Sequence, residues 1–209
     1  MIRGAIEAVI KAILNEKDFL NELDEKIGDG DHGLNMASGA RAVGEALDEL
    51  DDDADLKKIL HTLGEAITDN VGGSAGPLYG AALLEAAKVV DKNSALNVVT
   101  LEKIFGAAVE AIQKRGNAQR GEKTMLDVLI PIHESFKPET CAGKSLEEIL
   151  TQARDAARDG LEFTKTIAAK KGRAAALGNK SIGFEDPGAA SSLIIFRTLC
   201  GKWKDSFRE

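Results

Sequence analysis

Apolar side chains recur every three or four residues along almost the whole of this chain, and that spacing places residues on one face of an α-helix. The N-terminal segment shows the pattern clearly, because Ile2, Ile6, Val9 and Ile13 fall on one stripe. No segment alternates apolar and polar residues as a half-buried β-strand would. The periodicity therefore predicts an all-α protein.

Start and stop signals divide the pattern into about eight amphipathic helices. Ser145 opens a capping box, and Pro187 directly after Asp186 is typical of a helix start. Thr100 is expected to cap the helix that Gly116 ends. The predicted helices begin near Ile2, Leu34, Leu56, Ser74, Thr100, Lys123, Ser145 and Pro187.

The connections between these helices are short, so neighbouring helices should run antiparallel and pack as a bundle. The first helix is expected to continue past Leu20 to the turn that follows it. No Pro- or Ser-rich linker divides the 209 residues, so residues 1–209 are expected to form a single domain.

Composition and charge narrow the range of functions. The net charge of −7 argues against direct binding to nucleic acid, which attracts basic surfaces. The sequence shows no apolar run long enough to span a bilayer and no signal peptide, so membrane binding is not expected. Cys141 and Cys200 are too few for a disulfide framework or a cysteine zinc site. These features together predict a cytoplasmic protein.

Three aspartates, Asp24, Asp29 and Asp31, lie in one glycine-rich turn after the first helix. Carboxylates this close repel one another and raise each other's pKa unless a cation holds them ionised. Mg²⁺ takes oxygen ligands and is commonly shared between protein carboxylates and substrate phosphates. Gly28 and Gly30 let the backbone bend so that the aspartates converge. The turn therefore predicts a magnesium site that serves a phosphate-bearing ligand.

Several other motifs fit this region less well. The glycines of residues 28–33 have the spacing of a dinucleotide fingerprint, but that motif follows a strand, and a helix is expected here. An EF-hand loop that starts at Asp29 fails because Ala40 stands where the bidentate glutamate belongs. A P-loop that ends at residues 143–145 fails because Pro138 replaces its first glycine. A lone Asp-Gly-Asp is itself most often a solvated turn, so its surroundings decide the interpretation.

Glycine-rich segments lie between the predicted helices, at residues 28–33, 72–80, 116–121 and 172–188. They follow the first, third, fifth and seventh helices. Alternate connections of an up-and-down bundle fall at the same end. All four segments should therefore gather at one end, with the aspartate turn among them.

Two of these segments carry features that suit a phosphate. Residues 71–76 lead into a helix N-terminus, whose free amides and positive dipole end attract anions. Arg173 follows Gly172 and could pair with a phosphate through two hydrogen bonds. Alone, each feature is more often an ordinary helix cap or a surface arginine. Their expected position at one end favours a binding site.

Four motifs together resemble the family of nucleotide-binding L subunits of dihydroxyacetone kinase. Each motif is weak alone, but four in order with suitable spacing are specific, and the resemblance covers about residues 2–205. The motifs are Gly28-Asp29-Gly30-Asp31-His32-Gly33, Gly72-Gly73-Ser74-Ala75-Gly76-Pro77, Gly121-Glu122-Lys123-Thr124-Met125, and Gly172-Arg173-Ala174 with Asp186-Pro187-Gly188.

The resemblance implies a barrel of eight antiparallel helices with tightly bound ADP or ATP and two Mg²⁺ ions at one end. Asp24, Asp29 and Asp31 match the Mg²⁺ ligands, and His32 and Asn35 match residues that line the phosphates, with no residue needed as a nucleophile. The nucleotide-binding residues that the resemblance implies are His32, Gly33, Leu34, Asn35, Ser74, Ala75, Gly116, Thr124, Met125, Arg173, Asp186, Pro187 and Gly188.

The chain departs from the family pattern at Leu34, at Ala175-Ala176 and at Phe184. In the family, these positions more commonly hold a small polar residue, Ser-Tyr and His. The departures concern the nucleotide pocket and leave the three aspartates unchanged.

In this family the L subunit donates the phosphoryl group, and a companion K subunit holds dihydroxyacetone through its own histidine. One type joins both parts in a longer ATP-dependent chain. In the other type, ADP on a separate L subunit is recharged by a phosphohistidine carrier, the M subunit, which draws on phosphoenolpyruvate. This chain begins at Met1 without a K domain, so we expect the second type, with K and M subunits as partners. The sequence leaves homodimerisation open.

Three other functions stay open at this point. The chain could serve a related kinase for another small ketose or a fatty acyl group. It could be a non-enzymatic regulatory adaptor loaded with nucleotide. It could also be a helical bundle with a structural metal only.

Overall fold

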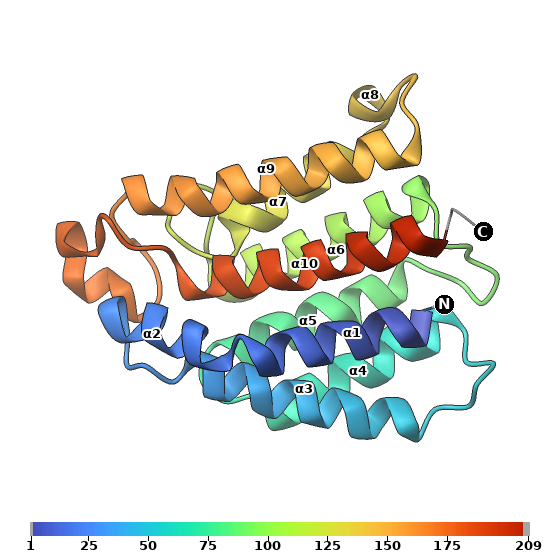
Figure 1. Ribbon diagram of the computed structural model, residues 1–209, viewed down its shortest axis with the longest axis horizontal. Coiled ribbons are helices and arrows are strands. Elements are labelled where there is room, and N and C mark those ends of the chain that lie inside the picture. The colour runs from blue at the N-terminus through green and yellow to red at the C-terminus, as the bar shows by residue number, and fades with distance from the viewer. Residues whose placement is uncertain (1, 207–209) are drawn as a thin grey trace.

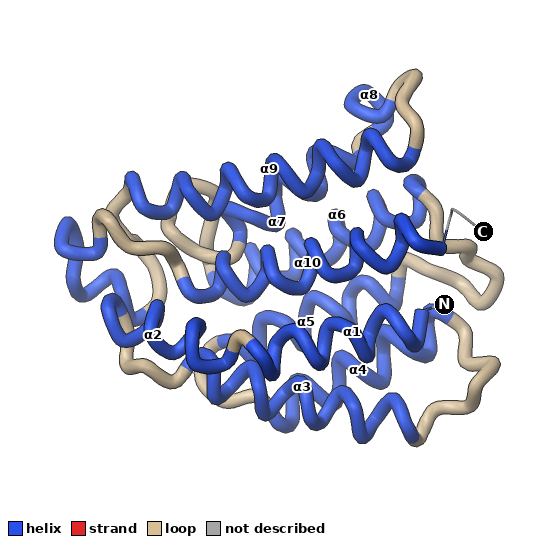
Figure 2. Tube along the Cα trace, viewed as in Figure 1, coloured by secondary structure: helices blue, strands red, loops and turns tan. Residues whose placement is uncertain are grey.

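The computed structural model describes residues 2–206, which form helices joined by turns and loops, with no strand among them (Figures 1 and 2). The prediction of an all-α protein is confirmed. The elements are α1 (Ile2–Asn15), α2 (Lys17–Ile27), α3 (His32–Asp48), α4 (Leu56–Asn70), α5 (Ala75–Lys88), α6 (Val98–Gly116), α7 (Leu126–Phe136), α8 (Pro138–Cys141), α9 (Leu146–Thr166), the 3-10 helix η1 (Arg173–Ser181) and α10 (Pro187–Ser206).

The longer helices close into a ring. Going round it, α3, α4, α5, α6, α7, α9 and α10 each pack against the next, α10 packs against α1, and α1 packs against α3. Figure 1 shows these helices side by side along the long axis of the molecule. This is the predicted barrel of antiparallel helices. α2 continues from the end of α1, and α8 is a helix of only 4 residues.

The interior of the ring is apolar. Phe105, Phe136 and Phe196, from α6, α7 and α10, meet there with ring centroids 5.5 to 6.2 Å apart. Leu126 and Ile132 of α7 belong to the same cluster and are fully buried. Burial of each such side chain stabilises the fold by about 1.5–3 kcal/mol. This core sets the spacing of the helices that carry the loops at either end.

The first predicted helix is divided in the structure. α1 ends at Asn15 and α2 begins at Lys17, with Glu16 between them at φ −93° and ψ 9°. Backbone hydrogen bonding still links the two helices through Glu16, since Glu16 N donates to Ala12 O at 3.1 Å and Leu20 N donates to Glu16 O at 2.9 Å. No glycine or proline lies there, and the apolar stripe runs through it, so the sequence carries no signal of the break.

Thr100 is not the cap of the fifth predicted helix. α6 begins before it, and Asn97 is the cap, with its side chain accepting a hydrogen bond from Thr100 N at 3.0 Å. Thr100 is instead buried, and its Oγ1 donates to Ala95 O at 2.7 Å. The capping box at Ser145 and the end of α6 at Gly116 are confirmed.

Three further local features differ from what the sequence suggests. Ser74 occupies the N-cap position of α5, but its side chain makes no capping hydrogen bond. Lys123 lies in a loop with a positive φ of 61°, and α7 starts only at Leu126. The short helices α8 and η1 were not predicted, because neither is long enough to show an apolar period, and Gly178 kinks η1 at φ 52°.

One end of the barrel carries the glycine-rich connections. α2 and η1 mark this end in Figure 1, opposite the N-terminus. Ile27, Ala169 and Ala174 form a small apolar cluster that packs η1 against the end of α2. Among the described residues, no helix combines the length and the apolar character needed to cross a membrane.

Candidate functional site

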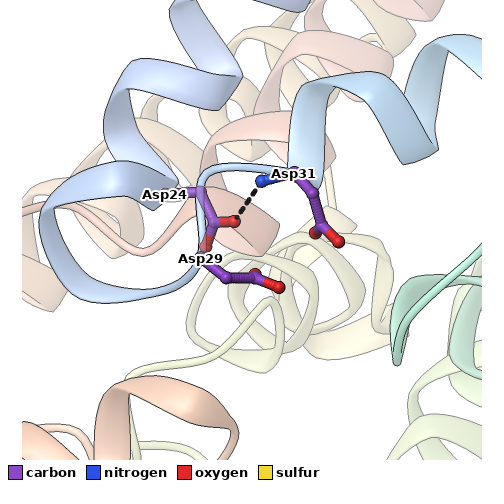
Figure 3. A group of neighbouring side chains, drawn as sticks. All are labelled: Asp24, Asp29 and Asp31. Atoms are coloured by element: carbon purple, nitrogen blue, oxygen red, sulfur yellow. Dashed lines mark hydrogen bonds between the residues drawn. The ribbon is translucent and has the colours of Figure 1, made fainter.

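The three aspartates converge in the turn between α2 and α3 (Figure 3). One carboxylate oxygen from each of Asp24, Asp29 and Asp31 lies within 4.8 Å of the other two. The amides of Asp31 and His32 donate to Asp24 Oδ2 at 3.0 and 3.2 Å, which orients that carboxylate. A β-carbon at Gly28 would collide with the Asp24 carboxylate, so glycine leaves that carboxylate in its present position.

This arrangement suits a hard divalent cation. Within residues 2–203, the aspartates form the one group of three or more His, Cys, Asp or Glu side chains close enough to share a metal ion. All their donor atoms are carboxylate oxygens, which Mg²⁺ prefers over nitrogen or sulfur. Asp24 and Asp31 are half-buried, whereas Asp29 is exposed. The donor set therefore fits the magnesium site expected from the sequence.

Arg173, at the start of η1, meets the same aspartates. Its guanidinium contacts Asp29 closely and lies 3.7 Å from Asp31 Oδ2. The arginine therefore neutralises part of the negative charge of the turn. Its side chain is 56% exposed, so it can reorient towards a ligand in the neighbouring cavity.

A cavity of about 1170 Å³ opens between the four glycine-rich connections. This volume is ample for a nucleotide, since small-molecule sites commonly enclose about 300–1,000 Å³. The connections that were predicted to gather at one end therefore do meet. The predicted site residues that line the cavity are Asp24, Asp29, Asp31, His32, Asn35, Ser74, Ala75, Gly116, Thr124, Met125, Arg173, Asp186, Pro187 and Gly188.

Gly33 and Leu34 are not brought to the cavity wall. Gly33 packs against α2, where a β-carbon would collide with the carbonyl of Lys17. Leu34 N donates to Asn21 Oδ1 at 3.0 Å, and the Leu34 side chain is 55% exposed. Both residues thus fasten the first turn of α3 to α2 and contribute to the site through that contact.

Asn35 connects the aspartate turn to the next loop. Its Nδ2 donates to Asp31 Oδ1 at 2.9 Å. A β-carbon at Gly72 would come within 2.6 Å of Asn35 Oδ1, so Gly72 allows the two loops to approach. The aspartate turn and the start of α5 therefore lie next to each other.

Asp186 caps α10, as the sequence predicts. Its Oδ2 accepts a hydrogen bond from Ala189 N at 2.7 Å. Burial raises the pKa of Asp186 to about 7, and the nearby charge of Asp127 adds to this effect. The carboxyl group on this wall of the cavity can therefore change its protonation state near neutral pH.

Comparison with known proteins identifies the family to which this helical barrel belongs. A family model described as the DAK2 domain matches residues 26–201, most of the chain. The chain belongs to the DAK2 domain family.

Two relatives of this DAK2 domain have nearly its own length. One is the ADP-binding subunit DhaL of a PEP-dependent dihydroxyacetone kinase 1 from Listeria innocua, 40% identical over 90% of this chain and 88% of the relative. The other is the ADP-binding subunit DhaL of the PEP-dependent dihydroxyacetone kinase from Escherichia coli, 37% identical over 88% of this chain and 87% of the relative.

A solved structure has the same fold. It is the dihydroxyacetone kinase of C. freundii in complex with AMP-PNP and Mg²⁺, with a TM-score of 0.75 and 27% identity. The match covers 96% of this DAK2 domain but 33% of that kinase, so the chain spans about a third of the larger protein.

Sequence reasoning missed a hydrogen-bonded group behind His32 of this DAK2 domain. His32 Nε2 lies 2.9 Å from Ser191 Oγ, and Tyr79 OH lies 2.9 Å from Ser191 Oγ and 2.8 Å from Ser192 Oγ. Burial lowers the pKa of His32, although the charges of Asp24 and Asp31 oppose this. The two serines sit on the buried face of α10, and polar residues on that face were the available signal.

Proposed function

We propose that this chain is the ADP-binding subunit of a phosphoenolpyruvate-dependent dihydroxyacetone kinase. It acts as the phosphoryl-donor subunit between a phosphohistidine carrier and dihydroxyacetone held on a K-type partner. Support comes from the relatives of similar length, which carry this function in their names. The chain would then be one subunit of a kinase made of several proteins.

One structural observation carries the proposal. Three carboxylates that suit Mg²⁺ lie on the wall of a nucleotide-sized cavity. This cavity lies at one end of the closed helical barrel. A structural metal alone would need the carboxylates but not the adjoining cavity of about 1170 Å³. The cavity therefore favours a nucleotide and metal site over a purely structural metal.

Asp24, Asp29 and Asp31 would hold two Mg²⁺ ions between the protein and the diphosphate. When bound, these ions supply the positive charge that phosphoryl transfer needs, so the protein has mainly to position the reactants. Asp24, whose carboxylate is already oriented by two backbone amides, would be the most rigid of these ligands. Arg173 would leave Asp29 when the cations bind and turn to the phosphates as a bidentate donor.

The N-terminus of α5 is the favoured seat for the phosphates. The N-terminus of α3 is less available for a phosphate, because its amides already have acceptors within the protein. The amides of Asp31 and His32 donate to Asp24, and that of Leu34 donates to Asn21. α5 begins at Ala75, and Gly72, Gly73 and Ser74 before it all line the cavity. A helix N-terminus attracts anions through its amides and dipole.

The direct test is to identify what leaves the protein on denaturation. We expect the purified chain to release about one ADP per molecule together with Mg²⁺, because two metals and four connections enclose the site. Chromatography of the released nucleotide and metal analysis of the same sample provide the measurement. A protein with metal but no affinity for ADP would instead be a bundle with a structural metal.

The second test separates a carrier-fed subunit from an ATP-exchanging kinase. The chain is loaded with radiolabelled ADP and mixed with K subunit, dihydroxyacetone, and either phosphorylated carrier or excess unlabelled ATP. We expect many turnovers with the label retained under the carrier, because product release no longer limits the cycle. Rapid loss of label with brisk ATP-driven turnover would contradict the carrier-fed mechanism, and an Asp29→Asn protein is the inactive control.

The cytoplasmic location stays a prediction.

A further inference from the structure

Lys123 is a buried lysine that the proposed reaction does not use. Its side chain is 1% exposed, and among the charged residues that the structure describes, only Lys123 and Asp127 are so deeply buried. Burial lowers the pKa of the Lys123 ammonium, and the charges of Asp186 and Asp127 oppose that shift. A buried ammonium is costly unless strong acceptors surround it, so its partners are informative.

Backbone carbonyl groups surround the Lys123 ammonium. Nζ donates to Thr164 O and to Phe184 O, each at 2.5 Å, and to Ile167 O at 3.4 Å. Thr164 and Ile167 lie at the C-terminal end of α9, where carbonyls lack partners within the helix and a cation is favoured. Phe184 lies in the segment that leads to α10.

The backbone around Lys123 forms one wall of the cavity. Lys123 has φ 61°, in the left-handed region that lysine rarely adopts, so its surroundings hold it there. Thr124 and Met125 follow it and line the cavity. Asp127 fixes the same loop from the other side, with its carboxylate accepting from Gly121 N at 2.6 Å and Thr124 N at 3.0 Å.

The segment that Phe184 belongs to forms another wall. Asp186 and Gly188, just beyond it, line the cavity. Asp186 N donates to Thr164 Oγ1 at 3.1 Å, while the carbonyl of the same Thr164 accepts from Lys123. One ammonium group therefore ties the end of α9 to both walls.

We propose that Lys123 is a positioning residue that fixes the Thr124–Met125 wall of the cavity relative to the Asp186–Gly188 wall, so that the nucleotide pocket is formed before the nucleotide binds. This inference rests on the proposed nucleotide site. A preformed pocket binds more tightly because less ordering opposes binding. Without the ammonium, three carbonyls lose their donor and the two walls can move apart.

The test replaces Lys123 by a side chain of similar length without a charge. For Lys123→Met we expect the dissociation constant for ADP, measured by titration calorimetry in the presence of Mg²⁺, to rise by about tenfold. The titration is run at a temperature where far-UV circular dichroism shows a folded protein. Lys123→Gln, which keeps a donor, is the second variant, with a smaller rise expected, and it carries the test if K123M does not fold.

Ser145→Ala is the matched control, because it removes the cap at the opposite end of the same helix α9. It should destabilise α9 but leave the dissociation constant for ADP within about twofold of wild type. Hydrogen exchange of the nucleotide-free protein adds a local readout. The amides of residues 117–125, 183–186 and 188 should exchange faster in Lys123→Met but not in Ser145→Ala.

The outcomes separate this inference from the proposed function. If the Lys123 variants bind ADP as tightly as wild type, or if Ser145→Ala weakens ADP binding equally, Lys123 has no positioning role and the proposed function stands. If the wild-type protein does not bind ADP at all, the proposed function fails, and the inference fails with it.

Discussion

Asp24 is the most firmly oriented carboxylate of the aspartate turn, because two backbone amides donate to one of its oxygens. Asp29 is exposed and contacts Arg173, so a bound cation would replace the arginine as its partner. Asp31 is intermediate, with Asn35 Nδ2 as a donor at 2.9 Å. The aspartate turn thus combines one firmly oriented carboxylate with two that could adjust to a cation.

Removing one carboxylate should weaken metal and nucleotide together. For Asp29→Asn and Asp31→Asn, the side chain keeps its size but loses the negative charge that would bind Mg²⁺. At a ligand concentration of 100 times the dissociation constant, binding stabilises a protein by about 2.7 kcal/mol. We expect Mg-ADP to stabilise wild type by about this free energy and so to raise its melting temperature. The melting temperatures of the two variants should rise much less.

Asp18→Asn is the matched control, since Asp18 lies on α2 with its side chain 84% exposed and does not line the cavity. It should respond to Mg-ADP like wild type. Equal stabilisation of wild type, Asp29→Asn and Asp31→Asn would show that these carboxylates are not ligands.

Asp186 should make the stability of the nucleotide-free protein fall as pH rises from about 4 to 7. Burial raises its pKa in the folded protein from the usual 3.8 to about 7. Between those values the folded protein holds a proton that the unfolded chain has lost, so the free energy of unfolding decreases with pH. Such a pKa change corresponds to about 4 kcal/mol, and because part of the carboxyl faces the cavity, we expect about 2 kcal/mol.

Asp186→Asn tests this because asparagine can still cap α10 but cannot ionise. Urea unfolding of both proteins in EDTA, at several pH values, gives the difference in the free energy of unfolding. The variant should gain stability over wild type as pH rises and keep the advantage above pH 7. A difference that does not depend on pH would mean that Asp186 ionises normally.

At the scale of the elements, caps and breaks decide where each helix begins. α9 starts where its capping box predicts, whereas α6 starts at Asn97 rather than at Thr100. Both residues are good cap formers by type. The choice between them depends on Thr100 being buried against the rest of the barrel, which a local pattern does not show.

Asn97→Ala should therefore cost about 1 kcal/mol of stability, the usual cost of losing an N-cap. Lys103→Ala, on an exposed position of α6, is the control and should stay within about 0.5 kcal/mol of wild type. Urea denaturation measures both. If Asn97→Ala were as stable as wild type, Asn97 would not be the N-cap that stabilises α6.

At the scale of the whole molecule, the contact of α10 with α1 and α9 closes the barrel. Two neighbouring residues of α10 contribute differently to that closure. Phe196 is 1% exposed and meets Phe105 and Phe136 in the core, while Arg197 pairs with Glu16 at 3.0 Å on the surface. Burial of apolar surface should dominate, because exposed ion pairs are screened by water.

Phe196→Ala should cost about 3–5 kcal/mol and Arg197→Ala at most about 0.5 kcal/mol. Chemical denaturation followed by circular dichroism measures both, with loss of helix as the signal. If Arg197→Ala were the more damaging change, the surface ion pair rather than the aromatic core would hold the barrel closed.

The sequence by itself determined the longer helices, their order and the end of the barrel at which the glycine-rich segments meet, but not the break between α1 and α2 or the short helices α8 and η1. These features depend on a local apolar period and on the alternation of helix direction. It also determined the aspartate turn, because Asp24, Asp29 and Asp31 lie close along the chain. Local proximity brings them together whatever the helices around them do.

Only the tertiary structure decided which distant residues support the site. His32 meets Ser191 across 159 positions of sequence, and Lys123 meets Thr164 across 41. An apolar period shows which face of a helix is buried but not how that helix is rotated or shifted against its neighbours. The partners of buried polar groups depend on that rotation and shift, and on loop conformations such as the left-handed backbone of Lys123. These are properties of the packed barrel, and no single segment of the sequence contains them.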